Sequence, residues 1–306
     1  MKKITFIMIL ITITLSFGMS IFSSPLLANT EKNNSNNNSN NGIENRSKYL
    51  NIITVNKPQY KMVKEIVKDK HNVVYMFTTE KDINDFKYSQ EVLDNVSNMD
   101  LFIYSGTTFE PWTNTFIDEL KKGSLGIINL SRGVRTINYD SARTNKENPY
   151  YFEGIEEYKI ALYNVKAAIQ DRDPQNRDYY EDNYKEAISE FDKKFKQYEN
   201  KLDKLKKYSF ITLDGGFEYI TKSLGLNTIK LDNHELSEFI KLNNMDLSKT
   251  IIIDDGENPS NLDLSKYNIV RLWKYYGDMS FEDLIIYNVD ELCKQVKDEV
   301  PQEKNQ

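Results

Sequence analysis

The chain has 306 residues, 39% of them hydrophobic and 28% charged, which is enough apolar material for one large or two modest globular domains. Its 46 acidic residues outnumber its 40 basic ones, and this argues against nucleic-acid binding, which depends on basic side chains that neutralise phosphates. The single cysteine, Cys293, excludes an internal disulfide and any multi-cysteine metal cluster.

The first 28 residues have the order of an export signal. Lys2 and Lys3 precede an apolar run over residues 4–17, and small and helix-breaking residues follow. Cleavage after Ala28 would remove two lysines and no acid, changing the net charge from −6 to −8. Bacterial lipoprotein signals end at a lipidated cysteine, but here Asn29 holds that place. We therefore expect an exported, extracytoplasmic protein that is not a lipoprotein, either secreted or held at the cell surface by an uncleaved signal.

A polar segment follows the signal. Residues 29–47 consist mostly of Asn, Ser, Lys and Glu, with Ile43 as the one apolar residue. Such a segment has no apolar surface to bury, so we expect a disordered, Asn-rich tether.

Short apolar runs then alternate with stretches of helical spacing over residues 48–175, which predicts an N-terminal α/β lobe. Strands are expected at residues 50–55, 73–77, 101–104 and 126–130. Pro58 can begin the helix after the first strand. The buried face of this helix would carry Met62, Val63, Ile66 and Val67. Short buried strands joined by helices indicate a parallel sheet.

Residues 176–207 predict one linking helix, because apolar and aromatic residues recur there every three to four positions without a glycine. The strand pattern restarts over residues 208–300, with strands expected at 210–213, 228–231, 250–253 and 269–273 and a closing helix at 281–296. Residues 301–306 form a tail. The predicted fold class is α/β: two Rossmann-like lobes joined by a long rigid linking helix, with a ligand cleft between the lobes.

Five motifs, in order, resemble the zinc/manganese-type (cluster A-I) solute-binding proteins of metal ABC transporters. They are residues 105–112 (SGTTFEPW), 128–134 (INLSRGV), 173–176 (DPQN, followed by Tyr180, Asn183 and Tyr184), 217–219 (FEY) and 224–226 (LGL). The resemblance covers nearly all of the chain after the tether. It implies the same two-lobed fold and a site between the lobes.

Members of that family hold Zn²⁺ or Mn²⁺ with usually three histidines and one carboxylate, since imidazole suits these metals. The resemblance places Asn84, Tyr150 and Asp214 at the first three ligand positions, and the fourth falls within residues 274–278, where Asp278 offers a carboxylate. The two histidines, His71 and His234, match no ligand position. We expect them to be surface or helix-start residues.

The substituted set contains only oxygen ligands. Such a set suits a hard cation or a polar organic ligand better than tightly bound zinc, and Asp214 is its best candidate for contacting a metal. A phenolate at Tyr150 together with carboxylates would also suit ferric iron. Alternatively, Tyr150 is a packing residue at the junction of the lobes. The implied cofactor is none, or a weakly bound divalent cation.

Two turns also leave alternatives open. Gly215 and Gly216 form either a tight strand-to-helix turn or a place where a bound anion approaches the helix N-terminus. Residues 254–256 (DDG) follow a predicted strand and indicate a turn, although Asp254 also faces the strand edge at which open α/β sheets bind ligands.

Two functions follow from these expectations. The first is an exported solute-binding protein with a degenerate metal site, which captures a small solute for an ABC permease membrane subunit and acts as a monomer. The second is an exported cell-surface interaction protein that keeps the fold but has lost transport and metal binding. An enzyme is not expected, because the chain has no Gly-x-Ser-x-Gly elbow, Walker loop or His-Glu-x-x-His motif.

Overall fold

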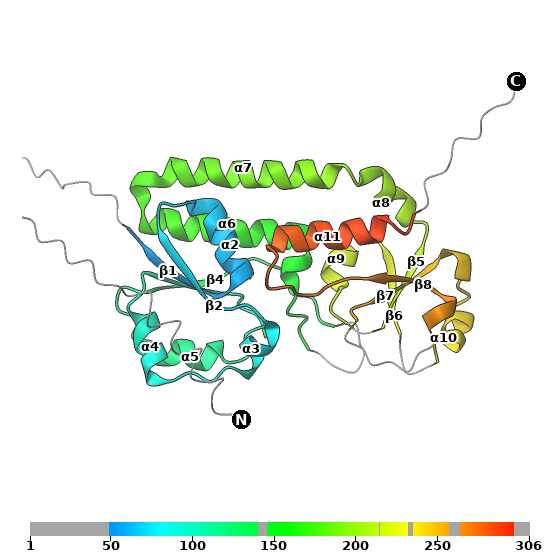
Figure 1. The fold of residues 1–306 in the computed structure, drawn as a ribbon, viewed down its shortest axis with the longest axis horizontal. Coiled ribbons are helices and arrows are strands. Elements are labelled where there is room, and N and C mark those ends of the chain that lie inside the picture. Colours follow the sequence, from blue (N-terminus) through cyan, green and yellow to red (C-terminus); the bar gives the residue numbers. More distant parts are fainter. Residues whose placement is uncertain (1–48, 140–145, 214, 232–234, 257–263, 297–306) are drawn as a thin grey trace, which may run out of the picture. The chain divides into compact units, whose positions relative to one another are not determined.

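A computed structural model describes residues 49–139, 146–213, 215–231, 235–256 and 264–296. These residues all belong to one compact unit that spans residues 45–306. They form two four-stranded parallel sheets with helices between and around them (Figure 1). The expected signal, tether and tail lie outside the described residues.

The first sheet has the strand order β2-β1-β3-β4. Its strands are β1 (Asn51–Asn56), β2 (Asn72–Phe77), β3 (Leu101–Tyr104) and β4 (Gly126–Asn129). All three pairings are parallel, and Ile52 is in register with both Val73 and Leu101. Each strand begins and ends within one residue of the bounds expected from the sequence, because apolar runs between turn residues mark buried strands clearly.

Local capping explains where the helices of this lobe begin. Asn56 caps α2 (Lys57–Val67) in a reciprocal capping box with Gln59, and Pro58 lies in the first turn. Thr79 caps α3 (Glu80–Asp85) and Ser89 caps α4 (Gln90–Ser97), while α5 (Thr113–Glu119) has no side-chain cap. The four residues expected on the buried face of α2 are all buried.

The alternation of side chains along β3 divides the lobe into two apolar layers. Leu101 and Ile103 pack on the side of α2, whereas Phe102 lies on the other side with Trp112 and Phe116. In Figure 1, α2 and α6 (Ile155–Arg172) lie on one side of this sheet and α4 and α5 on the other.

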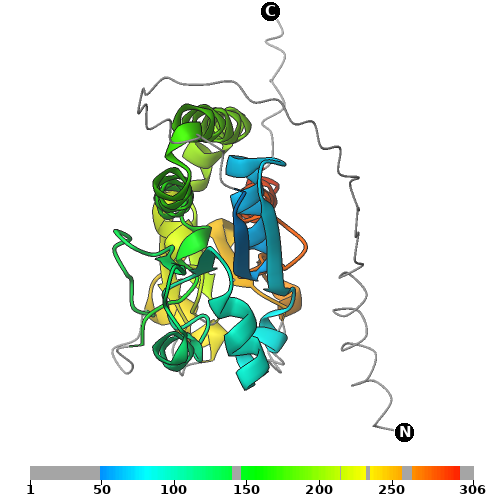
Figure 2. The ribbon, with the colours of Figure 1, turned by 90° about the vertical axis from the view of Figure 1, so that its left-hand side faces the viewer.

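The connection between the lobes differs in one respect from the single helix expected over residues 176–207. The short 3₁₀ segments η1 (Tyr151–Glu153) and η2 (Pro174–Asn176) precede α6 and α7, respectively. The linking helix α7 (Arg177–Lys196) ends at Lys196, and a separate helix, α8 (Glu199–Leu205), begins after a turn at residues 197–198. The prediction of one continuous helix was therefore wrong. At 1.5 Å per residue α7 is about 30 Å long. It packs antiparallel on α6, and both are seen nearly end-on in Figure 2.

The second sheet repeats the topology of the first with the order β6-β5-β7-β8. Its strands are β5 (Ser209–Thr212), β6 (Asn227–Lys230), β7 (Thr250–Asp254) and β8 (Asn268–Arg271). The helices are α9 (Glu218–Ser223), α10 (Leu236–Leu242) and α11 (Phe281–Cys293), with 3₁₀ turns η3 (Leu247–Lys249) and η4 (Leu264–Lys266). The closing helix thus ends three residues earlier than expected.

One continuous apolar core joins the two lobes. It runs from Ile52 and Leu101 in the first sheet, through Tyr158 and Phe191 on α6 and α7, to Ile251 in the second sheet. Since burial of apolar surface is the main stabilising contribution to folding, this core couples the lobes energetically. Within the part of the chain that the structure describes, no helix has both the length and the apolar character needed to cross a membrane.

Candidate functional site

The turn after β3, residues 105–112, is hydrogen-bonded to both α2 and α3. Both carboxylate oxygens of Glu110 accept from the main-chain N–H of Ser105, at 3.0 and 3.2 Å, and Oε1 also accepts from Gln59 Nε2 at 3.1 Å. Trp112 Nε1 donates to the main-chain oxygen of Ile83 at 2.9 Å and so holds α3 against the turn. Burial raises the pKa of Glu110 to about 7. The turn therefore positions α3 and the residues around it.

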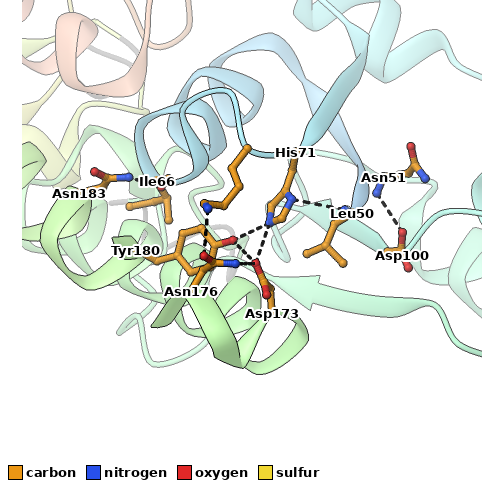
Figure 3. Close-up of polar contacts among 10 residues, drawn as sticks. Leu50, Asn51, Ile66, His71, Asp100, Asp173, Asn176, Tyr180 and Asn183 are labelled. Carbon is orange, nitrogen blue, oxygen red and sulfur yellow. Dashed lines mark hydrogen bonds and ion pairs between the residues drawn. The ribbon is translucent and has the colours of Figure 1, made fainter. Parts of the chain in front are cut away.

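The structure corrects the expectation that His71 is a surface residue: its side chain is 1% exposed. Its Nε2 lies 2.7 Å from the hydroxyl of Tyr180, which donates to Asp173 Oδ2 at 2.5 Å (Figure 3). Its Nδ1 accepts from the main-chain N–H of Leu50 at 3.4 Å. Nδ1 is thus unprotonated, and Nε2 carries the hydrogen that is donated to Tyr180.

Burial lowers the pKa of His71, so the neutral ring is favoured. Asn176 also donates to Asp173 Oδ2, at 2.7 Å, and Asn183 Nδ2 donates to the main-chain oxygen of Ile66 at 2.8 Å (Figure 3). The DPQN, Tyr180 and Asn183 motif therefore fastens the start of α7 to the first lobe. In the structure, this motif has a structural role.

Tyr150 lies where elements of both lobes meet. It is 8% exposed, its hydroxyl donates to Glu80 Oε1 at 2.7 Å, and its ring packs edge-on against Phe109 and Phe152. Burial, with a smaller contribution from the Glu80 carboxylate, raises the pKa of the Tyr150 phenol. The phenol is therefore protonated at neutral pH, which disfavours a phenolate ligand for ferric iron.

Of the other expected ligands, Asn84 and Asp278 are exposed and Asp214 lies outside the described residues. Asn84 is exposed on α3. Asp278 is also exposed and pairs with Lys57 Nζ at 2.6 Å, and this hydrogen bond and charge hold the pKa of Asp278 below its usual value. Asp214 and His234 fall outside the described residues. Tyr150 and Asp278 are engaged by Glu80 and Lys57, and the role of Asn84, Tyr150 and Asp278 as ligands stays a prediction.

The residues around Asp278 form what we call the lobe contact, made by residues 78–80 and 150 against residues 274–278. Lys61 Nζ donates to the main-chain oxygen of Asp278 at 2.5 Å, and Tyr275 Oη donates to the main-chain oxygen of Thr78 at 3.1 Å. A Cβ atom on Gly277 would lie 1.6 Å from that same Thr78 oxygen. The two lobes therefore approach each other here at backbone distance.

The two turns with open alternatives have clear geometry. Gly216 has a φ of 126°, and its N–H donates to Glu218 Oε2 at 2.8 Å. The chain's own carboxylate thus satisfies this donor, which favours the tight turn over an anion site. Asp254 Oδ1 likewise accepts from the N–H of Gly256 at 3.1 Å, as expected for a turn.

An ion pair between a buried carboxylate and a partly buried lysine, which the sequence did not point to, lies beside this turn. Lys274 Nζ is 2.7 Å from Asp255 Oδ2, and the two side chains are 13% and 3% exposed. Lys274 is the first residue of the 274–278 stretch, which the resemblance matched to the fourth ligand position and in which Asp278 was the expected ligand. Its ammonium also faces the rings of Tyr150 and Phe217.

The described residues form surface concavities large enough for a small molecule, and two of them are not lined by Asn84, Tyr150 or Asp278. One of about 440 Å³ lies against α9 and β6, and one of about 460 Å³ lies between α2, α7 and α11. Among the described residues, no three His, Cys, Asp or Glu side chains are grouped so that they would hold a metal ion.

Two parallel α/β lobes linked by a long helix define the class of two-lobed solute-binding proteins. The family model "Zinc-uptake complex component A periplasmic" matches residues 52–251. The chain belongs to this family, whose curated relatives are substrate-binding proteins of metal ABC transporters.

The high-affinity zinc uptake system protein ZnuA of Bacillus subtilis is 25% identical over 193 residues, 60% of each chain. The manganese ABC transporter substrate-binding lipoprotein PsaA of Streptococcus pneumoniae is 27% identical over 186 residues, 58% of this chain and 60% of PsaA. The chain thus matches about 60% of the length of these relatives.

Solved structures confirm the fold. The metal-dependent lipoprotein YcdH of Bacillus subtilis superposes with a TM-score of 0.67 at 23% identity, covering 80% of this chain and 98% of YcdH. Zn(II)-bound AdcA of Streptococcus pneumoniae gives 0.66 at 18% identity, covering 83% of this chain and 59% of AdcA.

Proposed function

We propose that this protein is the exported solute-binding component of a metal-type ABC transporter, and that its own site is degenerate toward zinc and manganese. Family membership supports the transport role. The observation that carries the second part is the set of side chains at the matched ligand positions, which are Asn84, Tyr150, Asp214 and Asp278. None is an imidazole, and Tyr150 and Asp278 are already bonded to Glu80 and Lys57.

The proposed cargo is a weakly held cation or a non-metal solute, and the proposed partner is the membrane subunit of an ABC permease. Titration calorimetry of the purified, metal-free protein with zinc and manganese tests the site. We expect dissociation constants weaker than about 10 µM, because few oxygen ligands without net charge compensation bind divalent cations weakly. A nanomolar zinc constant would contradict a degenerate site.

A gain-of-function variant tests the alignment of the site independently. Asn84→His, Tyr150→His and Asp214→His together should create tight zinc binding if these three positions face one site. A folded triple variant that binds zinc no better than the wild type would count against the proposed positions.

The lobe contact favours a second candidate function, an exported interaction protein that has lost transport. Tyr275, Gly277 and Asp278 of the second lobe already bond or pack against Thr78 and Lys57 of the first. A thermal-shift screen against divalent cations and amino acids, with pull-down of the permease from solubilised membranes, separates the two candidates. Transport predicts a stabilising solute and a captured permease, and the interaction protein predicts neither.

A further inference from the structure

Lys274 and Asp255 lie at the carboxyl ends of two neighbouring strands of the second sheet. Asp255 directly follows β7, and Lys274 follows the end of β8 by three residues. The ligands of open α/β sheets bind outside this edge. Here the edge holds a carboxylate that is 3% exposed and, 2.7 Å away, the ammonium of the chain's own lysine.

Aromatic rings complete the surroundings of this ammonium. Lys274 Nζ lies 5.8 Å from the ring centroid of Tyr150 and 6.0 Å from that of Phe217. A carboxylate combined with aromatic faces is a chemistry that attracts cations, since the faces of the rings carry partial negative charge. Gly216 leaves room for the lysine, because a Cβ there would lie 2.4 Å from Lys274 Cδ.

Two fully buried asparagines hold the backbone on both sides of the ammonium. Asn288 on α11 accepts from the N–H of Trp273 at 3.0 Å and donates to its carbonyl at 2.8 Å, directly before Lys274. Asn148 donates to the carbonyl of Gly216 at 3.2 Å. These hydrogen bonds hold the backbone next to Lys274 and at Gly216, so the segments that surround the ammonium are fixed in place.

We propose that Lys274 is the resident cation of a cation site at the lobe contact and determines specificity by excluding free divalent cations. Its ammonium already neutralises Asp255, and a second cation there would meet like-charge repulsion at low effective dielectric. A tethered cation also competes at a high effective concentration, which a free ion at physiological levels does not reach. The inference rests on the proposed function in that it concerns the same site.

The test compares the wild type with Lys274→Ala by titration with manganese and zinc chlorides. We expect the variant to bind at least one of them roughly tenfold more tightly, equivalent to about 1.4 kcal/mol. Arg271→Ala is the matched control, because Arg271 pairs with the adjacent Asp254 at 3.3 Å but is 62% exposed. It should bind as the wild type does.

Chemical rescue provides a second readout that does not depend on metal geometry. Removing Lys274 leaves the Asp255 carboxylate without this counterion, so n-butylammonium or a divalent cation should raise the melting temperature of Lys274→Ala but not that of the wild type. The double variant Lys274→Met/Asp255→Asn lacks both charges and should show no such rise. If Lys274→Ala is unfolded, the same cations should restore its circular-dichroism spectrum.

The proposal is overturned if no cation binds or stabilises Lys274→Ala more than the wild type, or if the double variant responds equally. Tight zinc binding by the wild type would instead contradict the degenerate site of the proposed function. The role of Lys274 is tested by the ratio of the dissociation constants of the variant and the wild type, whereas the proposed function is tested by the dissociation constant of the wild type alone.

Discussion

The hydroxyl of Tyr180 lies 2.7 Å from Nε2 of His71, so that the first turn of α7 is joined to the segment that leads into β2. The same hydroxyl donates to Asp173, and both partners are almost completely buried. Buried polar groups depend on such partners, because they have given up their bonds to water. The link therefore fixes how the linking helix leaves the first lobe.

Tyr180→Phe should destabilise the protein by roughly 1–3 kcal/mol, since it leaves His71 Nε2–H and Asp173 with one partner fewer in a buried place. Urea unfolding followed by circular dichroism measures the loss. Tyr179→Phe is the matched control, because its side chain is 38% exposed, and it should change stability by less than about 0.5 kcal/mol. Equal effects of the two variants would contradict a structural role for the hydroxyl.

Stability should fall as the pH rises from about 5 to 8. Burial raises the pKa of both Glu110 and Glu65 to about 7, against an ordinary value of 4.5. Between these values the folded state binds more protons than the unfolded state, so the free energy of unfolding decreases with pH. Urea unfolding at several pH values checks the sign of the slope.

Glu110→Gln should reduce this slope, because the amide does not titrate and keeps an acceptor for Gln59 and Ser105. The exposed Glu91→Gln serves as its control and should leave the slope unchanged. A slope in Glu110→Gln identical to that of the wild type would contradict titration of the Glu110 carboxyl in this pH range.

Gly277→Ala should disrupt the lobe contact. Its Cβ would lie 1.6 Å from the main-chain oxygen of Thr78, and backbone atoms cannot yield as a flexible side chain does. We expect a loss of roughly 1–3 kcal/mol, seen as a lower melting temperature, with a larger radius of gyration in X-ray scattering. Tyr275→Phe, which removes only the bond to Thr78, should cost about 1 kcal/mol without opening the lobes. An unchanged Gly277→Ala protein would mean that the lobes do not meet here in solution.

The protein should not be diacylated, because Asn29 stands where a lipoprotein signal has its cysteine. This contrasts with PsaA and other relatives that are named lipoproteins. Labelling of cells with a fatty-acid analogue should leave the protein unlabelled, while Asn29→Cys should take up the label. Label on the wild-type protein would contradict this prediction.

The sequence by itself determined the order, type and approximate bounds of the strands, the helix after the first strand and the closing helix. The apolar run at residues 101–104, Pro58 at the start of α2 and the period of apolar residues along α7 are local signals, which can be recognised in the sequence alone. The same reading missed the end of α7 at Lys196, because the apolar period continues through Tyr198 and Leu202 although the backbone turns.

Only the tertiary structure decided which polar groups meet. The burial of His71 depends on Tyr180, more than a hundred positions away, and the pairing of Lys274 with Asp255 and the Tyr150 ring depends on loops from different strands. A polar residue in a sequence carries no mark of its partner, because its burial and bonding are set by segments that fold against it from elsewhere in the chain. For that reason the two-lobed α/β fold of residues 48–300 could be predicted from the sequence, whereas the position of the Lys274 ammonium beside Asp255 could not.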